Sequence, residues 1–388
     1  MILTGLDRFI EEVDNYRNRR IALIVNQTSV TRDFQYSWNE LRKRGAAIRR
    51  IFTPEHGLFA TEQDQVAVKS QPDIDCDIIS LYGESYDSLI PNQNLFQDID
   101  LVIFDIQDVG ARYYTYVNTM ALVMKSIEKR DIEMLILDRP NPIGGNKVEG
   151  PLLNGDFSSF VGIIPVTVRH GMTPAELALY YRDAERIDIN LSVVKMHGWR
   201  RGMLFSETGL PWIPPSPNMP TEDTAYIYPG LCLIEGLNIS EGRGTAAPFK
   251  LIGASFIEPC EFAEYLNSLG IGGVYFRQVF FKPCFNKYAD EEVGGVFIHI
   301  TDVGRLKPFA TGIAIVKSLH DLYKDRVVFL KDIYEFNSTH PAFDLLCGSS
   351  SIREMILNGS EMSEIIGSWR GDEDDFSAIK REYHLYEY

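Results

Sequence analysis

The chain has 388 residues, of which 45% are hydrophobic and 24% are charged, and its formal net charge is −16. This composition is typical of a folded globular protein, and the length favours two domains over a single core. So acidic a chain lacks the basic face that nucleic-acid binding requires, and we expect no nucleic-acid partner. The composition is compatible with a small anionic ligand held by local arginines.

The first 20 residues contain no basic stretch followed by an apolar run. As it stands the sequence therefore predicts a cytoplasmic protein, whereas a trimmed N-terminus would make it periplasmic or secreted. No apolar run approaches the roughly 20 residues that span a bilayer, so we expect no membrane span. The five cysteines are scattered and never in CxxC spacing, which indicates a reduced compartment and gives no zinc signature.

The first half of the chain alternates between strand and helix patterns. The expected strands cover 21–27, 48–57, 76–83, 101–108 and 134–142, and the expected helices cover 36–45 and 114–130. Near-continuous apolar strands separated by helices predict an α/β fold, a parallel sheet with helices on both faces. We expect a further strand–helix–strand unit over 161–199, in which Thr173 caps the helix and Pro174 occupies its first turn.

The second half begins with a change in composition. Residues 210–230 are rich in proline, and we interpret them as an ordered crossing between domains that is neither regular helix nor central strand. Beyond them the sequence predicts a smaller α/β domain. Its expected helices cover 260–270 and 309–325, its expected strands cover 274–283 and 294–302, and the acidic residues 371–375 are expected to form a solvated turn.

Polar clusters follow the predicted strands of the first half. They comprise Asn26-Gln27-Thr28 and the segments 54–57, 105–113 and 138–142. Because open parallel sheets bind ligands beyond the carboxyl ends of their strands, these clusters predict a functional cleft at that edge. The segment 54–57, Pro-Glu-His-Gly, brings an acid and a base to the edge.

Several ligand classes lack their motifs here. No GxGxxG follows the first strand and no GxxxxGK[ST] occurs, which disfavours a nucleotide cofactor. No GxSxG elbow or cysteine nucleophile signature is present. We expect no bound metal, and the alternative that the residues leave open is a metal site built from His56, Asp105, Asp108 and Asp138. Abundant carboxylates, amides and arginines are the set that glycoside hydrolysis needs.

Motifs along nearly the whole chain resemble one family, the NamZ-like exo-β-N-acetylmuramidases of peptidoglycan turnover. They are PEHG at 54–57, the pattern at 105–116, DRPNPIGG at 138–145, EGP at 149–151, RHGMT at 169–173, PPSPN at 214–218, YPG at 228–230 and GRGT at 242–245. The resemblance implies a Rossmann-like catalytic domain at 1–228, a smaller α/β domain at 229–388, and a cleft near their junction with PPSPN along one wall. It also implies release of N-acetylmuramic acid from non-reducing ends of peptidoglycan fragments without a cofactor.

The catalytic candidates are Glu55, His56, Asp108 and Glu149. Glu55 is our first choice for the general acid, because apolar neighbours favour a neutral carboxyl; its alternative is a turn or capping glutamate. His56 either holds Glu55 or a sugar hydroxyl, or makes a structural hydrogen bond. Asp108 is expected to orient the substrate acetamido group or a water, and Asp105 to tie loops. Glu149 is either the second catalytic group or half of a salt bridge.

The substrate implied by the resemblance carries a lactyl carboxylate, which suits the bidentate fork of arginine. Arg112 and Arg243 are our leading candidates for that contact. The predicted substrate-binding residues are Asp105, Gln107, Arg112, Tyr113, Asp138, Arg139, Asn141, Arg169, His170, Asn218 and Arg243. The alternative functions are a non-catalytic muropeptide-binding protein and a metal-dependent hydrolase.

Overall fold

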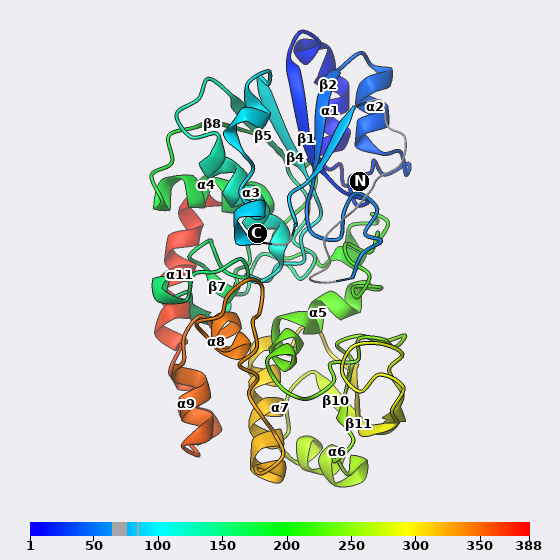
Figure 1. Ribbon diagram of the computed structural model, residues 1–388, viewed down its shortest axis with the longest axis vertical. Coiled ribbons are helices and arrows are strands. Elements are labelled where there is room, and N and C mark those ends of the chain that lie inside the picture. The colour runs from blue at the N-terminus through cyan, green and yellow to red at the C-terminus, as the bar shows by residue number, and fades with distance from the viewer. Residues whose placement is uncertain (64–75, 84) are drawn as a thin grey trace. The chain divides into compact units, whose positions relative to one another are not determined.

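The computed structural model describes residues 1–63, 76–83 and 85–388 (Figure 1). The chain forms two compact units that are interleaved in sequence. Unit 1 comprises Met1–Lys147, Gly171–Pro217 and Ala378–Tyr388, and unit 2 comprises Val148–His170 and Asn218–Ser377. The division into two domains after residue 228 stays a prediction.

Unit 1 is built on a six-stranded parallel sheet, as predicted. In spatial order its strands are β3 (Asp77–Ser80), β2 (Ala47–Thr53), β1 (Arg20–Val25), β4 (Leu101–Asp105), β5 (Glu133–Leu137) and β8 (Asn190–Val194). This is the strand order of a Rossmann-like doubly wound sheet. Successive strands are added on one side of β1 as far as β3, and on its other side from β4 onward. The central strands β1 and β4 are almost wholly buried, which explains their continuous apolar sequences.

Helices cover both faces of this sheet (Figure 1). They are α1 (Gly5–Glu12), α2 (Ser37–Lys43), α3 (Thr115–Ser126) and α4 (Pro174–Ala184). Ile21, Leu23 and Val25 alternate along β1 and join one core cluster with residues of α1 and α2. On the opposite face, α3 and α4 contact each other and α4 contacts β5. Thr173 caps α4 as predicted, because its hydroxyl accepts from the Glu176 amide.

The predicted strand–helix–strand unit over 161–199 is wrong in its first strand. β7 (Thr167–Arg169) pairs antiparallel with β6 (Glu149–Leu152) in a separate two-stranded sheet of unit 2. Only α4 and β8 return to the parallel sheet. An apolar run indicates a strand but does not specify its partner, so the excursion through unit 2 was not visible in the sequence.

Unit 2 also contains a three-stranded antiparallel sheet and a set of helices. The sheet order is β10 (Val274–Phe281), β11 (Val293–Ile300) and β9 (Leu251–Ala254). The helices are α5 (Glu222–Leu231), α6 (Pro259–Ser268), α7 (Pro308–Tyr323), α8 (Ala342–Cys347), α9 (Ser351–Leu357), α10 (Met362–Gly367) and α11 (Arg370–Lys380), whose C-terminal end belongs to unit 1. The predicted α6, α7, β10 and β11 are confirmed.

Helix α5 contradicts our expectation that residues 210–230 contain no regular helix. Pro229 lies inside this helix, whose residues from 224 to 231 are all buried. Gly230 packs directly against α7: a Cβ at this position would lie 1.8 Å from the Pro308 carbonyl oxygen. Gly312 of α7 makes the reciprocal approach, with 2.1 Å from a built Cβ to the Gly230 carbonyl oxygen. Close packing of two glycines thus overrides the unfavourable helix propensity of the YPG motif.

The acidic residues 371–375 form part of α11, not a solvated turn. Asp372 and Glu373 lie in its first turn, where carboxylates are favoured by the helix dipole. Glu373 accepts a hydrogen bond from the Gly150 amide at 2.9 Å, and Asp372 accepts one from the Leu152 amide at 2.9 Å. The carboxylates therefore satisfy backbone donors of β6, a long-range role that a local charge pattern does not indicate.

Candidate active site

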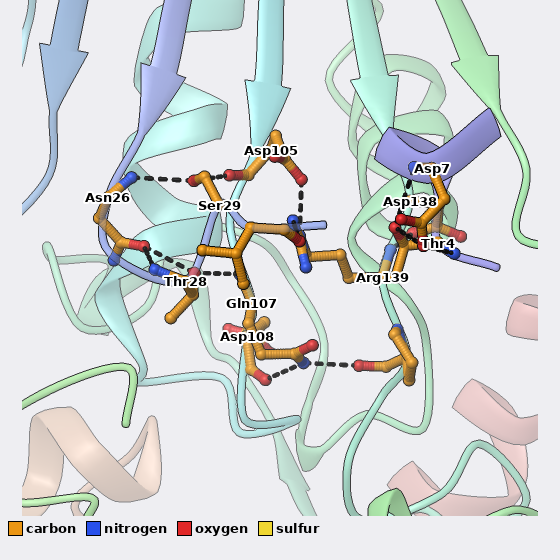
Figure 2. Close-up of polar contacts among 12 residues, drawn as sticks. Thr4, Asp7, Asn26, Thr28, Ser29, Asp105, Gln107, Asp108, Asp138 and Arg139 are labelled. Atoms are coloured by element: carbon orange, nitrogen blue, oxygen red, sulfur yellow. Dashed lines mark hydrogen bonds and ion pairs between the residues drawn. The ribbon is translucent and has the colours of Figure 1, made fainter. Parts of the chain in front are cut away.

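The predicted polar clusters of unit 1 lie beyond the carboxyl edge of the parallel sheet. Val25, the last residue of β1, is in register with Asp105, the last residue of β4. The loops that follow these two strands therefore start side by side, at the position where the strand order reverses (Figure 2). This is where doubly wound sheets bind ligands.

A hydrogen-bond network joins the two central loops (Figure 2). The Thr28 hydroxyl donates to Asn26 Oδ1 at 2.6 Å and accepts from the Gln107 amide at 3.0 Å. The Ser29 hydroxyl accepts from the Asn26 amide at 3.0 Å and donates to the Asp105 carbonyl oxygen. Buried polar groups that satisfy one another in this way fix the loops at the sheet edge.

Glu55 and His56 occupy a tight turn after β2. Glu55 is buried, and its Oε2 accepts a hydrogen bond from the Thr115 hydroxyl at 2.8 Å. His56 has a φ of 69° and Gly57 has a φ of 80°, so two consecutive residues adopt the left-handed conformation that glycine tolerates best. A histidine held in this conformation is uncommon and is more frequent at functional sites.

The hydrogen bond of the His56 ring defines its neutral tautomer. Nδ1 lies 3.0 Å from the Glu62 carbonyl oxygen. A carbonyl oxygen can only accept, so Nδ1 carries the proton and Nε2 is the basic nitrogen of the neutral ring. The contact matches the structural hydrogen bond that the sequence analysis left open for His56, and it presents a proton acceptor at Nε2.

Asp108 lies on the loop after β4 and is buried. Its Oδ2 accepts a hydrogen bond from the Gly110 amide at 2.7 Å. Burial raises the pKa of Asp108 to about 7, although the backbone amides of Gly110 and Val109 oppose this shift. A carboxyl group with this pKa exchanges a proton near neutral pH, which is the property that acid–base catalysis requires.

Tyr114 lies within the electrostatic influence of both Glu55 and Asp108. Burial raises the pKa of the Tyr114 phenol above its ordinary value, and the neighbouring carboxylates of Asp108 and Glu55 raise it further. Its ring packs edge-on against Tyr116, with 4.9 Å between ring centroids. Burial also raises the pKa of Tyr116, again with a contribution from Glu55. The two carboxyl groups thus share one electrostatic neighbourhood beside two protonated phenols.

The segment 210–217 supplies two backbone anchors to the same edge. Gln27 Nε2 donates to the carbonyl oxygens of Pro214 and Pro215 at 2.8 and 2.9 Å. The Tyr116 hydroxyl also donates to the Pro215 carbonyl oxygen. The part of PPSPN that belongs to unit 1 is therefore ordered against the loop after β1 and helix α3.

Asp105 and Arg139 form a buried ion pair. Arg139 Nε lies 2.6 Å from Asp105 Oδ1, and Nη2 donates to the Val30 carbonyl oxygen at 3.1 Å. Burial raises the pKa of Asp105, while Arg139 opposes the shift. The pair ties the loops after β4, β5 and β1, which agrees with the loop-tying role expected for Asp105.

Gln107, Asp138 and Asn141 are held by structural hydrogen bonds. Gln107 Nε2 donates to the carbonyl oxygens of Asp108 and Pro140 at 2.8 and 2.7 Å. Asn141 Nδ2 donates to the Met172 carbonyl oxygen at 3.0 Å. The Asp138 carboxylate accepts from Thr173 Oγ1, from the amides of Ala175 and Arg139, and from the Tyr386 hydroxyl. Asp138 therefore anchors the start of α4.

Arg112 and Tyr113 are also buried in unit 1, on the segment that leads into α3. The Arg112 carbonyl oxygen accepts from Asn118 Nδ2 at 3.1 Å, which closes this segment against the helix. Both residues therefore belong to the same loop as Asp108, between β4 and α3.

The other predicted site residues belong to unit 2. Glu149 and Arg169 face each other in register across β6 and β7. Glu149 Oε1 accepts from the Ala310 amide in the first turn of α7 at 2.8 Å, and burial raises its pKa to about 7. Burial lowers the pKa of Arg169, and the nearby Glu149 opposes this shift. His170 and Asn218 are buried.

Arg243 lies in a compensated charge cluster of unit 2. Its Nη2 lies 2.8 Å from Glu235 Oε1, and its Nε lies 3.4 Å from Glu241 Oε1. Lys287 Nζ also pairs with Glu241, at 3.1 Å. Two cations and two carboxylates thus neutralise one another, which weakens the case for Arg243 as the residue that recognises a substrate carboxylate.

Sequence reasoning missed Thr115, Tyr114 and Ser29 as site residues. Thr115 and Ser29 are ordinary helix-start and turn residues by pattern, and nothing local predicts their partners. For Ser29 the signal was present, because it extends the polar run Asn26-Gln27-Thr28 directly after a buried strand.

Three further features bear on the class of protein. Among residues 1–63, 76–83 and 85–388, no group of three His, Cys, Asp or Glu side chains is arranged to hold a metal ion. The same residues include no helix with the length and apolar character needed to cross a bilayer. No disulfide joins any of the five cysteines, all of which lie within the described chain.

Comparison with known proteins shows the family. Residues 21–223 match the family described as exo-β-N-acetylmuramidase NamZ, N-terminal, and residues 226–386 match its C-terminal counterpart. The peptidoglycan β-N-acetylmuramidase NamZ of Bacillus subtilis strain 168 is 40% identical over 389 residues, which cover 99% of this chain and 91% of that protein.

Two crystal structures of DUF1343 family proteins from Bacteroides fragilis share the fold. One has a TM-score of 0.88 at 32% identity and the other a TM-score of 0.73 at 28% identity, and each comparison covers 100% of this chain and 99% of the other. The fold and these relatives place the chain among α/β glycosidases. The chain belongs to the NamZ family of exo-β-N-acetylmuramidases.

Proposed function

We propose that this chain is an exo-acting glycosidase that releases N-acetylmuramic acid from the non-reducing ends of peptidoglycan fragments. The observation that carries this proposal is its 40% identity, over 99% of its length, to a peptidoglycan β-N-acetylmuramidase. The buried carboxyl groups beyond the parallel sheet supply the chemistry that glycoside hydrolysis needs.

Glu55 is the proposed general acid. Its carboxyl group is buried at the ligand-binding edge, and the Thr115 hydroxyl fixes one oxygen. The other oxygen can then deliver a proton to the leaving-group oxygen of the glycosidic bond. His56 is anchored through Nδ1 to the Glu62 carbonyl oxygen and would offer Nε2 to a substrate hydroxyl.

Asp108 is the proposed second carboxyl group. Its pKa of about 7 makes the ionised form available at neutral pH without a large loss of basicity. In this role Asp108 either activates a water or attacks the anomeric carbon, and both steps require the carboxylate. Tyr114, close to both acids, would hydrogen-bond the sugar or the incoming water.

The remaining predicted residues of unit 1 support these groups. Asp105, Arg139 and Gln107 hold the loops, and Asp138 and Asn141 hold the segment after β5. In unit 2, Glu149 stays an alternative candidate for the second catalytic group, and Arg169, His170 and Asn218 stay proposed substrate contacts.

The test is product analysis with two defined disaccharides. One carries N-acetylmuramic acid at the non-reducing end, and the other carries it only at the reducing end. We expect mass spectrometry to detect free N-acetylmuramic acid and a shortened partner from the first disaccharide alone. Binding of the first disaccharide without cleavage would favour the muropeptide-binding protein instead. Cleavage of both would contradict the exo direction.

A further inference from the structure

A hollow in unit 1 is not used by the proposed acid–base chemistry. Its outline includes open solvent and spans about 350 Å³, of which about 20 Å³ can hold the centre of a water-sized group. Its polar lining residues include Arg32, Arg139, Thr28 and Gln107. Gln107 immediately precedes Asp108 and donates to its carbonyl oxygen at 2.8 Å, so the hollow adjoins the loop that carries the proposed second carboxyl group.

Arg32 is the cation of this hollow that has no counter-charge in contact. Within the described residues its guanidinium makes no hydrogen bond or ion pair, and its Nη1 is buried without a partner. Its backbone amide donates to Asp7 Oδ1 at 3.2 Å, which fixes the loop after β1 but leaves the side chain unused. A buried guanidinium N–H without an acceptor is costly, so the site suits an acceptor that the described part of the chain does not supply.

Arg139 contributes a second guanidinium to the same hollow. Its Nε and Nη2 donate to Asp105 and to the Val30 carbonyl oxygen. The ion pair with Asp105 compensates the charge of Arg139 and holds its position, so Arg32 provides the uncompensated attraction. Guanidinium groups bind carboxylates through paired N–H donors, so two arginines in one hollow favour a carboxylate ligand.

The same hollow has apolar lining residues, which include Phe205, Ile213 and Val30. A carboxylate attached to a short apolar group would therefore suit both kinds of lining residue. An ammonium, a neutral polar group or a bare hydrocarbon would leave either the guanidinium groups or the apolar side chains without a suitable contact.

We propose that this hollow is the subsite for the lactyl carboxylate of the muramic acid residue, with Arg32 as the residue that binds it. The lactyl group combines one carboxylate with one methyl group, which suit the arginines and the apolar lining residues respectively. This inference rests on the proposed function, since that function supplies the sugar. It replaces Arg112 and Arg243, the candidates from sequence, with an arginine that follows the polar run after β1.

The test compares two chromogenic muramides that differ only in charge: the free lactyl acid and its methylamide. We expect wild type to prefer the acid in kcat/KM, and Arg32→Gln to reduce this preference by roughly tenfold to a hundredfold, the worth of one charged hydrogen bond. Arg32→Lys, which keeps the charge but loses the fork, should give an intermediate ratio. Arg49→Gln removes an exposed arginine of β2 and should keep the wild-type ratio.

Direct binding distinguishes the two proposals. Calorimetry with N-acetylmuramic acid and its lactyl methylamide needs no turnover, and Arg32→Gln should abolish the difference in affinity between them. If wild type cleaves muramides but Arg32→Gln keeps the full preference for the acid, this inference is wrong and the proposed function stands. If wild type cleaves neither muramide, the proposed function fails. Tight binding of free D-lactate to wild type would instead assign the hollow to a separate small carboxylic acid.

Discussion

The Thr115 hydroxyl donates a hydrogen bond of 2.8 Å to the carboxylate of Glu55. It joins the first turn of α3 to the turn after β2, two segments that are 60 residues apart in sequence. Through this contact the helix that follows the Asp108 loop sets the orientation of the proposed acid. Both proposed catalytic carboxyl groups are therefore positioned by one connected part of unit 1.

Thr115→Val should lower kcat on a muramide by about tenfold or more, because it removes one hydrogen bond to a carboxylate, worth about 1.5–3 kcal/mol. KM should change little, since the fold and the substrate contacts remain. Thr119→Val is the matched control: its hydroxyl donates to the Thr115 carbonyl oxygen within the same helix and does not contact Glu55. Equal losses in both variants would mean that the effect is on the helix and not on the acid.

The pKa of Asp108 predicts the pH profile. Burial raises this pKa to about 7, so Asp108 is protonated below about pH 7 and ionised above it. As a base or nucleophile it must be ionised, and kcat/KM should fall as the pH drops through about 7. The residual activity of Asp108→Asn should lack this limb. A wild-type activity that instead rises as the pH drops through that range would assign Asp108 the role of the acid.

The Asp105–Arg139 ion pair predicts a stability effect. Arg139→Met leaves the buried Asp105 carboxyl without its cation and should destabilise unit 1 by about 3–5 kcal/mol. Adding Asp105→Asn to Arg139→Met removes the stranded charge and should recover much of this loss. Urea denaturation of the single and double variants measures both effects. A double variant no more stable than Arg139→Met would show that the pair is not the source.

Glu149 predicts stability that depends on pH. Its folded pKa of about 7 lies above the ordinary value of 4.5, so the folded state favours the protonated form. The contribution is full below pH 4.5 and is lost as the pH rises through 7. Glu149→Gln cannot ionise, and it should therefore raise the melting temperature at about pH 8.5 but not at about pH 5.

Glu373→Gln alters a neighbouring carboxylate whose pKa burial also raises, so it should raise the melting temperature at about pH 8.5 in the same direction. A melting temperature of Glu149→Gln below that of wild type at both pH values would instead indicate that the electrostatic attraction of Arg169 dominates. Loss of activity without loss of stability would support Glu149 as a catalytic group.

Gly230→Ala should destabilise the packing of α5 on α7. The added methyl carbon would lie 1.8 Å from the Pro308 carbonyl oxygen, so one helix has to move. Gly371→Ala, where no atom lies within 4 Å of a built Cβ, is the matched control in α11. Thermal melts that are indistinguishable for the two variants would contradict the close approach of the helices.

The parallel sheet could be predicted because its signals are local. β1 and β4 are buried on both faces, so both have continuous apolar runs, Ile21 to Val25 and Leu101 to Phe104, which predict strands clearly. The cap of α4 was equally predictable, since Thr173, Pro174 and Glu176 lie within four residues. Because parallel strands end at the same edge of a sheet, the polar residues that follow them could be predicted to gather there.

The remaining features depend on partners distant in sequence. β7 pairs with β6 instead of the main sheet, and α5 forms despite Pro229 because Gly230 packs on α7. The motif around Arg243 suggests a cation that could bind substrate, but it does not reveal the ion pairs with Glu235 and Glu241. Arg32 belongs to no motif, because a single arginine in a loop forms no recognisable sequence pattern. Charge compensation is a property of three-dimensional neighbours, and the sequence does not contain it directly.

The most direct test of the account is the turnover of Glu55→Gln on a muramide with a poor leaving group. The substitution keeps the size of the side chain and an acceptor oxygen for Thr115, and it removes only the ionisable proton donor. We predict a kcat about 10²–10⁴ times lower than that of wild type, with a smaller loss on an activated phenolic muramide that needs less protonation. Wild-type kcat on the poor leaving group would contradict the assignment of Glu55 as the acid and, with it, the proposed site at the edge of the parallel sheet.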